Sequence, residues 1–537
     1  MTRLGREERV RTRRSRWSRG PVRELATLNF FLHGFSSSSA NNPFVKNNKL
    51  KLTESRGHGV AWRSPGSQAF VISTILSLSH TKMPGIDSLP TELLLAIFEL
   101  VMSAPTIDSF DDYGYNDSIL ASCTCTWPDI FDPMNGPWVL GQVCHVFRSV
   151  VLSIPELWSK FYVRSPPHNH DSAVEVLRVW LSRSGDLPLQ FQITATLEFC
   201  SHPSFPALLT SLVASSDRWK ILALADVSMK FLDALASERR ARLFPFPLLK
   251  ALSVLLRDWD NDFDDLTDLN ELTPALEVFG HAPNLDTLIN FNGLNLSRFK
   301  LPWNQLTAYV GSDASHAFEH LEVMLLSPNL VECDIAFDRT HTWPLVPPLV
   351  LRRLRKWTIR FTDLSTNICT ILSKDIQVPN LQELVFLGAD AYLLTPCLDL
   401  FQTILRSSDC SLQYLELSGC TDHISLSQFL QTVATITCLR IWLNNFAILP
   451  LTVLYFDPPQ QTLVPMLNTL ELGLTERANI FNLDMAVLAA VVRSRDCVRR
   501  LNIVMGSLEP EITGPQVFPP IMEVLQEEGL QIHVYNR

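Results

Sequence analysis

The residues best suited to chemistry in this sequence form an acidic run at positions 260–271, Asp-Asn-Asp-Phe-Asp-Asp-Leu-Thr-Asp-Leu-Asn-Glu. Carboxylates at places 1, 3, 5, 9 and 12 of this run match the ligand spacing of a calcium-binding EF loop. However, Asp265 occupies the place where that loop needs glycine, and Thr267 replaces the usual apolar residue. We therefore expect a solvated acidic loop, and an enzyme that uses these carboxylates, with or without calcium, is the alternative.

Other motifs for catalysis or metal binding are weak. Cys123 with Cys125, and His168 with His170, form short pairs, but neither has a second pair at the spacing of a zinc site. The patterns G-x-x-x-x-G-K-[ST], G-x-S-x-G and H-E-x-x-H do not occur. The sequence thus predicts a non-catalytic protein with no cofactor and no metal.

Length and charge indicate what such a protein binds. A chain of 537 residues is too long for one compact core, and its 46% hydrophobic and 19% charged residues are typical of a folded chain. Residues 1–82 carry 15 lysines and arginines against 4 acidic residues, whereas the rest carries 30 against 51. Because an acidic body repels phosphate, we expect a protein partner and no nucleic acid.

The sequence has neither a membrane-spanning stretch nor a regular cysteine pattern, and both features bear on its cellular location. Its longest apolar stretch, 485–492, is far too short to cross a membrane, and its 11 cysteines have no regular spacing. We expect no membrane association and a place in the cytoplasm or nucleus. Residues 1–82 are predicted to be a disordered basic extension; a nuclear-import or polyanion-binding arm and a transit peptide are alternatives, and Met83 is a possible true start.

Helical patterns begin after this extension. Residues 86–101 place Pro90 in a first turn and apolar residues at helical spacing, which predicts an amphipathic helix. Four prolines and an acidic group predict a long loop over 103–137. A second helix is expected from Leu140 to Val151, because apolar residues recur there at i, i+3, i+4, i+7 and i+11, before Pro155.

These residues resemble the F-box motif, in the form found in large fungal families. The match covers 86–162 and rests on Leu89-Pro90-x-Glu92-Leu93-Leu94-x-x-Ile97-Phe98, Val143-Cys144-x-x-Phe147 and Pro155-x-Leu157-Trp158. It departs from the family in the long insertion 103–137 and in Phe147, where tryptophan is usual.

The resemblance implies that these helices bind a Skp-type adaptor and, through it, a cullin. The residues that it assigns to this contact are Leu89, Pro90, Leu93, Ile97, Val143, Cys144 and Phe147. So small a helical module has little core of its own, and we expect its apolar ridge near Leu93 to be covered by a partner. The alternative is that residues 86–162 only cap the rest of the chain.

A short template recurs from residue 249: a leucine, two variable residues, an apolar residue, one variable residue and another apolar residue. Nine copies start at 249, 285, 330, 354, 381, 412, 436, 467 and 498. Each copy predicts one strand, because alternation of apolar residues over so short a run is typical of β-structure.

The template resembles leucine-rich repeats, and the copy from Leu412 to Cys420 fits best. The resemblance implies an α/β fold in which residues 165–537 form a curved solenoid with parallel strands on its concave side. A generic α/β domain with leucine-rich strands is the alternative.

Alternate strand residues would then face solvent on the concave side. We expect this face to hold a protein substrate through Arg360, Tyr414, Glu416 and Trp442, because arginine and aromatic side chains often anchor interfaces. Taken with the F-box resemblance, the sequence predicts a substrate-receptor subunit of a cullin-based ubiquitin ligase. The alternative is a repeat scaffold without any ligase.

Overall fold

The protein is described here from a computed structural model. The described residues are 89–103, 127–164, 170–242, 246–256, 277–292, 299–311, 317–337, 348–361, 376–388, 391–418, 423–443, 454, 463–474, 485–494, 497–505 and 520–536. All of them belong to one compact unit, Pro65–Arg537. The extension 1–82, the Cys123 and Cys125 pair, His168 and the acidic run 260–271 lie outside the described residues.

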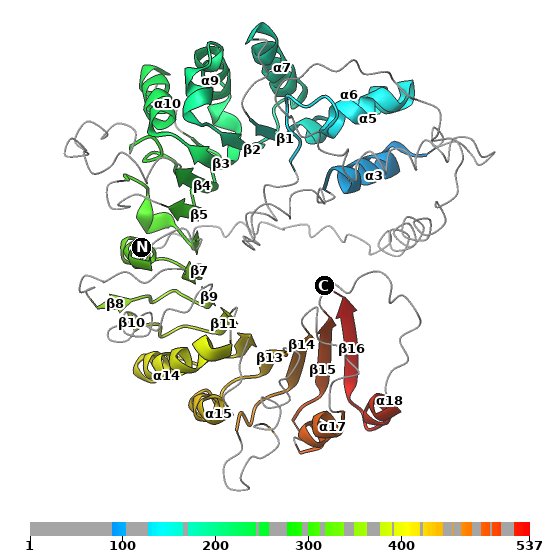
Figure 1. Cartoon of the computed structure of the whole chain (residues 1–537), viewed down its shortest axis with the longest axis vertical. Helices are drawn as coiled ribbons and strands as arrows, with labels where there is room; N and C mark the ends of the chain where they lie inside the picture. The colour runs from blue at the N-terminus through cyan, green and yellow to red at the C-terminus, as the bar shows by residue number, and fades with distance from the viewer. Residues whose placement is uncertain are drawn as a thin grey trace, which may run out of the picture. The chain divides into compact units, whose positions relative to one another are not determined.

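The fold is α/β and is built on one large sheet of 14 strands, all parallel (Figure 1). Neighbours in the sheet follow the order of the chain, and only β8 and β10 leave it to form a small parallel pair. The strands are β1 (Lys160–Val163), β2 (Leu189–Thr194), β3 (Trp219–Val227), β4 (Ala251–Leu256), β5 (Thr287–Asn292), β6 (Ala308–Gly311), β7 (Glu332–Phe337), β8 (Leu349–Val350), β9 (Lys356–Phe361), β10 (Ile376–Gln377), β11 (Glu383–Gly388), β12 (Tyr414–Ser418), β13 (Cys438–Leu443), β14 (Thr469–Leu474), β15 (Arg500–Met505) and β16 (Gln531–Asn536).

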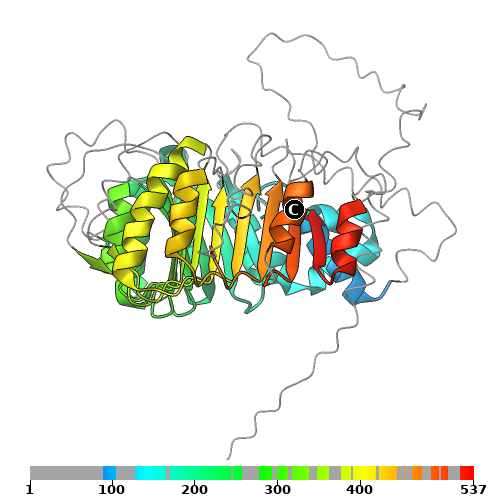
Figure 2. The same ribbon diagram turned by 90° about the horizontal axis from the view of Figure 1, so that it is seen from below.

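Helices connect many of the successive strands and pack on one face of the sheet, as Figures 1 and 2 show. They are α7 (His170–Arg183), α8 (Leu197–Ser201), α9 (Phe205–Val213), α10 (Met229–Arg242), α12 (Ala317–Leu326), α14 (Ala391–Ser408), α15 (His423–Thr432), α17 (Met485–Arg493) and α18 (Pro520–Glu527), with short 3-10 turns η5 (Ser216–Arg218) and η8 (Trp303–Gln305). Within the described ranges, no helix is long and apolar enough to cross a membrane.

Each of the nine template copies coincides with a strand of the large sheet, so that prediction is confirmed. The middle apolar residue of each copy falls in one register row that runs across all 14 strands. This row reads Phe161, Phe191, Leu222, Leu252, Leu288, Tyr309, Cys333, Trp357, Leu384, Leu415, Leu439, Leu470, Leu501 and Ile532. All but the last are fully buried, and they form the core between sheet and helices.

A helical module precedes the sheet and consists of α3 (Thr91–Ser103), α5 (Gly136–Val143), α6 (His145–Ser153) and η4 (Pro155–Trp158). The first predicted helix is present, and the carbonyl of Pro90 accepts hydrogen bonds from the amides of Leu93 and Leu94 in its first turn. The glutamate of that turn, Glu92, lies near the positive end of the helix dipole.

The second predicted helix is wrong as one continuous element. The helix starts at Gly136, and Cys144 interrupts it with an extended backbone, φ −158° and ψ 172°. The Cys144 Sγ then accepts a hydrogen bond from the amide of Phe147 at 3.4 Å and caps α6. Apolar spacing does not reveal this break, because both short helices keep the same period on either side of it.

The module is attached to the first edge of the sheet by aromatic packing. Trp138 of α5, Trp158 of η4 and Trp180 of α7 meet edge to face, with ring centroids 4.9–5.9 Å apart. The guanidinium of Arg183 lies 4.8 Å from the ring centroid of Trp138 and 4.5 Å from that of Trp158. Asp129 also pairs with Tyr162 of β1 through a parallel bridge, which extends the sheet past its first strand.

Candidate functional site

The first candidate surface is the exposed side of α3. Leu94 and Phe98 point into the core, with 1% and 0% of their surface exposed, whereas Leu93 is 47% exposed. Pro90 is exposed, and Leu89 and Ile97 are half-buried against the core. Residues 90, 93 and 97 share one side of the helix because they are three and four positions apart. An apolar leucine therefore lies in the middle of an accessible helix face.

The structure divides the seven residues that were expected at the adaptor contact. Val143 and Cys144 are half-buried at the junction of α5 and α6, so part of each is accessible. Phe147 is fully buried and packs edge to face on Phe98, with ring centroids 4.9 Å apart. Phe147 is thus a core residue that holds α6 on α3, and it has no exposed surface for the contact to which the sequence assigned it.

Sequence reasoning missed one exposed leucine in this module. Leu152 of α6 is 45% exposed although it belongs to a short apolar helix. The sequence could have indicated this exposure, because Leu152 directly follows Val151 and so lies outside the apolar stripe predicted for this helix. Val151 belongs to that stripe and is buried. Large apolar residues off the buried stripe of an amphipathic helix are the ones that face solvent.

The second candidate surface is the face of the sheet opposite the helices, which we call the helix-free face. Two register rows run across it. Row A is Lys160, Gln190, Ile221, Ala251, Thr287, Ala308, Glu332, Lys356, Glu383, Tyr414, Cys438, Thr469, Arg500 and Gln531; row B is Tyr162, Gln192, Ala223, Ser253, Ile289, Val310, Asp334, Thr358, Val385, Glu416, Arg440, Glu471, Asn502 and His533.

The residues expected to bind a substrate lie on the helix-free face, but they are less exposed than the sequence predicted. Glu416 and Trp442 are each 8% exposed, and the side chain of Arg360 is 17% exposed. Tyr414 is half-buried. Neighbouring strands lie about 4.8 Å apart, so long side chains on adjacent strands cover one another.

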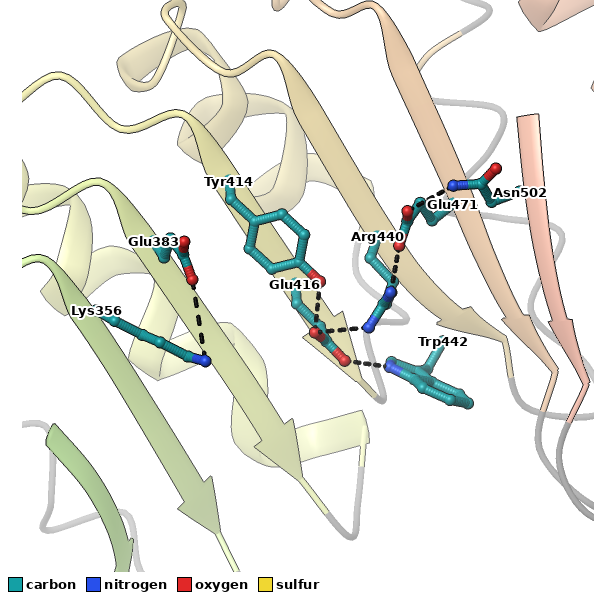
Figure 3. A network of polar contacts seen from close by, with 8 residues as sticks. All are labelled: Lys356, Glu383, Tyr414, Glu416, Arg440, Trp442, Glu471 and Asn502. Atoms are coloured by element: carbon teal, nitrogen blue, oxygen red, sulfur yellow. Dashed lines mark hydrogen bonds and ion pairs between the residues drawn. The ribbon is translucent and has the colours of Figure 1, made fainter. Parts of the chain in front are cut away.

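Glu416 is the centre of a polar network over β12 to β15 (Figure 3). Its Oε1 accepts a hydrogen bond from the Trp442 indole at 2.6 Å, and its Oε2 accepts one from the Tyr414 hydroxyl at 2.7 Å. Arg440 lies 3.3 Å from the same Oε2 and also donates to Glu471 Oε2 at 2.6 Å through its Nε. Asn502 donates to Glu471 Oε1 at 2.6 Å and ends the network.

Gly473 makes the position of Trp442 possible. A Cβ atom at Gly473 would lie 2.3 Å from two ring carbons of Trp442, so the indole rests directly on the glycine backbone. The two residues are register partners on β13 and β14. A glycine inside a strand often marks such a close approach, and this was the sequence signal for the contact.

The network carries more negative than positive charge, because two carboxylates share one guanidinium. Burial raises the pKa of Tyr414, and the neighbouring Glu416 raises it further. Burial, together with the charge of Glu471, raises the pKa of the Cys438 thiol to about 12. Burial favours the neutral form of Arg440, but Glu416, Tyr414 and Glu471 reverse this and raise its pKa. Tyr414, Cys438 and Arg440 therefore all stay protonated at neutral pH.

A second ion pair lies two strands away from the network. Arg360 and Asp334 meet at 2.5 Å, and their side chains are 17% and 16% exposed. The Asp334 Oδ1 and Arg360 Nε atoms are buried and have no hydrogen-bond partner. Burial raises the pKa of Asp334, and the nearby Arg360 only partly opposes that effect.

These contacts join the predicted substrate-binding residues into two internal clusters and leave little of them free. Within the part of the chain that the structure describes, no group of three or more His, Cys, Asp or Glu side chains could hold a metal ion. The helix-free face can thus offer shape, charge and hydrogen bonds to a partner, and α3 offers an apolar ridge.

Comparison with known proteins gave no further guide: no protein-family model matches the chain, and a search of curated proteins found no significant relative.

Proposed function

We propose that the protein is a substrate-receptor subunit of a cullin-based ubiquitin ligase. In this role α3 binds a Skp-type adaptor, and the helix-free face holds the protein to be modified. The observation that carries the proposal is the 47% exposure of Leu93, beside the buried Leu94 and Phe98, in a segment that resembles an F-box. Pro90, Leu93 and Ile97 place accessible apolar side chains next to one another on this helix face, and contiguous exposed apolar surface is typical of a place where a partner binds.

The sheet supports the second part of the proposal. We infer that it is the strand layer of a curved leucine-rich solenoid whose concave side is the helix-free face. Sequential parallel strands, one per template copy, and a row of buried residues that crosses all but the last of them are what stacked repeats produce. Such a face is long enough to hold an extended partner.

The mechanism requires no chemistry from this chain. A receptor that binds the adaptor at one end and a protein along its sheet keeps that protein close to a ligase assembled on the adaptor. The gain is the effective concentration of the bound protein near the transferring enzyme, which can reach millimolar values in tethered systems. The cytoplasm and the nucleus are the compartments where we expect this activity.

The test is co-purification of the adaptor with variants of the full chain. Leu93→Asp places a charge in the proposed contact at a solvent-exposed position, so folding is retained while adaptor recovery falls at least tenfold. Leu248→Asp is the matched control, because Leu248 is 41% exposed and lies just before β4. Equal recovery of the adaptor with the Leu93 variant and with the control would refute the proposal.

A repeat scaffold without a ligase is the second candidate, and one observation favours it. The tryptophan cluster with Arg183 and the bridge from Asp129 to Tyr162 attach the helical module to β1 as a cap would. Terminal units with such a covering are required in repeat proteins. The same purification separates the two candidates, because a scaffold recovers its partner with neither adaptor nor cullin.

A further inference from the structure

The helix-free face changes character between its first and its later strands. From β7 to β15 rows A and B carry charged residues on most strands, whereas from β3 to β6 none of their side chains is charged. The uncharged patch consists of Ile221, Ala223, Ala251, Ser253, Thr287, Ile289, Ala308 and Val310. It spans four adjacent strands without interruption.

The patch is partly accessible along row A. Ile221, Ala251, Thr287 and Ala308 are half-buried, whereas Ala223 and Ser253, two residues further along their strands in row B, are 3% and 4% exposed. Its side chains are mostly short, and the flanking residues Gln190 and Glu332 are longer. A contiguous apolar surface of this kind, bordered by polar residues, is typical of a place where another polypeptide binds.

Two exposed charges bracket the patch in row A. Glu332 of β7 borders it directly, and Lys160 of β1 lies on the other side, separated from the patch by Gln190 of β2. Neither forms an ion pair with any residue that the structure describes, whereas Lys356 and Glu383, further along the same row, pair with each other at 4.0 Å. The row therefore has a direction: a positive charge on one side of the uncharged patch and a negative charge on the other.

We infer that this patch binds an extended segment of a partner protein that is acidic at one end, small and apolar in the middle, and basic at the other end. The acidic end lies over Lys160 and the basic end over Glu332. Six strand intervals separate the two, about 29 Å at 4.8 Å each, which an extended chain crosses in about nine residues at 3.3 Å each. Alternate side chains of the segment face the patch.

The inference deepens the proposed function. It rests on that function only in identifying the bound segment as the part of the substrate protein that the receptor recognises. The adaptor contact on α3 shares no residue with the patch. Failure of peptide binding with normal adaptor recovery therefore overturns this inference alone, and failure of adaptor recovery overturns the ligase proposal alone.

The experiment is selection of a random dodecapeptide phage library on the immobilised full-length protein. The expected result is enrichment of peptides with an acidic residue and a basic residue about nine positions apart and uncharged small apolar residues between them. No enrichment, or enrichment without this charge order, overturns the inference.

Charge-swapped variants make the test specific. The double variant Lys160→Glu with Glu332→Lys changes only exposed side chains, so it should fold, and it should select peptides of the reverse charge order. Glu383→Lys is the matched control on the same row, outside the patch, and should select the original order. An unchanged preference of the double variant contradicts the inference.

A blocking variant tests the patch itself. Ala251→Asp should reduce binding of an enriched, fluorescein-labelled peptide at least tenfold in anisotropy titrations. If the unmodified chain instead elutes as a dimer in size-exclusion chromatography and this variant as a monomer, a second copy occupies the patch and the inference is wrong.

Discussion

At Glu416 a single buried carboxylate accepts hydrogen bonds from Tyr414, Trp442 and Arg440. A buried carboxylate without such partners would carry a large desolvation cost, and these donors remove most of it. The residues that looked like exposed anchors in the sequence therefore hold one another in place. The alternation of apolar and polar residues along a strand predicts on which face of the sheet a side chain lies. It does not predict whether side chains of the neighbouring strands cover that side chain.

Burial, and after it the charge of Glu471, should lower the reactivity of the Cys438 thiol. Because the thiol pKa is raised from 9.0 to about 12, alkylation by iodoacetamide at pH 8 should run about a thousandfold slower than for an unperturbed thiol, since each pKa unit is tenfold. Glu471→Gln removes one cause of the shift and should accelerate the reaction. Mass spectrometry of the Cys438 peptide, with a short cysteine peptide as reference, measures both rates; equal rates in the variant and the original chain would contradict this electrostatic account.

Gly473 should tolerate no side chain. Gly473→Ala forces the Trp442 indole off its position and weakens its hydrogen bond to Glu416, which should cost about 1–3 kcal/mol, as overpacking usually does. The urea midpoint measures the loss. In a Trp442→Ala background the added methyl group has space, so Gly473→Ala should cost much less there; an equal cost in both backgrounds would show that the contact is not responsible.

Asp334 should make the protein less stable as the pH rises. Its folded pKa is raised above 3.8, so the folded state binds the proton more tightly than the unfolded chain does. The resulting contribution is complete below pH 3.8 and is lost as the pH rises through the folded pKa. Urea midpoints between pH 4 and 7 should therefore fall for the original chain relative to Asp334→Asn. A constant difference across this range would contradict the raised pKa.

Among the elements, the strands were the most predictable. The template located nine of them because a buried leucine row needs the same apolar spacing in every repeat. It missed β1 and β3, where Trp158 and Trp219 replace the leading leucine, and β6, where Gly311 replaces the last apolar residue. It also missed β16, because Leu530 precedes Ile532 by two residues instead of three.

One side of α3 is buried and the other is exposed, so substitutions on the two sides should affect stability differently. Phe98 is buried against Phe147, so Phe98→Ala should destabilise the module by about 3–5 kcal/mol, the usual cost of deleting a buried aromatic ring. Leu93→Ala changes an exposed residue and should shift stability by no more than about 0.5 kcal/mol. Hydrogen exchange of the α3 amides reports both effects, and comparable exchange rates in the two variants would disprove the assignment of buried and exposed sides.

On the scale of the whole molecule, one hydrophobic core runs through the described residues from the helical module to α18. The same buried cluster contains Phe98 and Phe147 of the module and Leu525 of α18. The sequence suggested two separate parts because a helical pattern gives way to a strand pattern near residue 160. It could not show their junction, because contacts among Trp138, Trp158 and Trp180 join residues that no local pattern relates.

The continuous core also has a functional consequence. The module is packed on β1, so in the proposed ligase the adaptor on α3 and the substrate on the helix-free face would be held at a fixed separation. A receptor that works by proximity benefits from this, because a fixed geometry concentrates the bound protein at one place.

The most direct test of the ligase proposal is reconstitution with a purified Skp-type adaptor. The full-length protein and the adaptor, mixed at equal concentration, should elute from a size-exclusion column as a one-to-one complex by light scattering, and Leu93→Asp should return both to their separate positions. Separate elution of the original chain and the adaptor, with the chain folded by circular dichroism, would contradict the account.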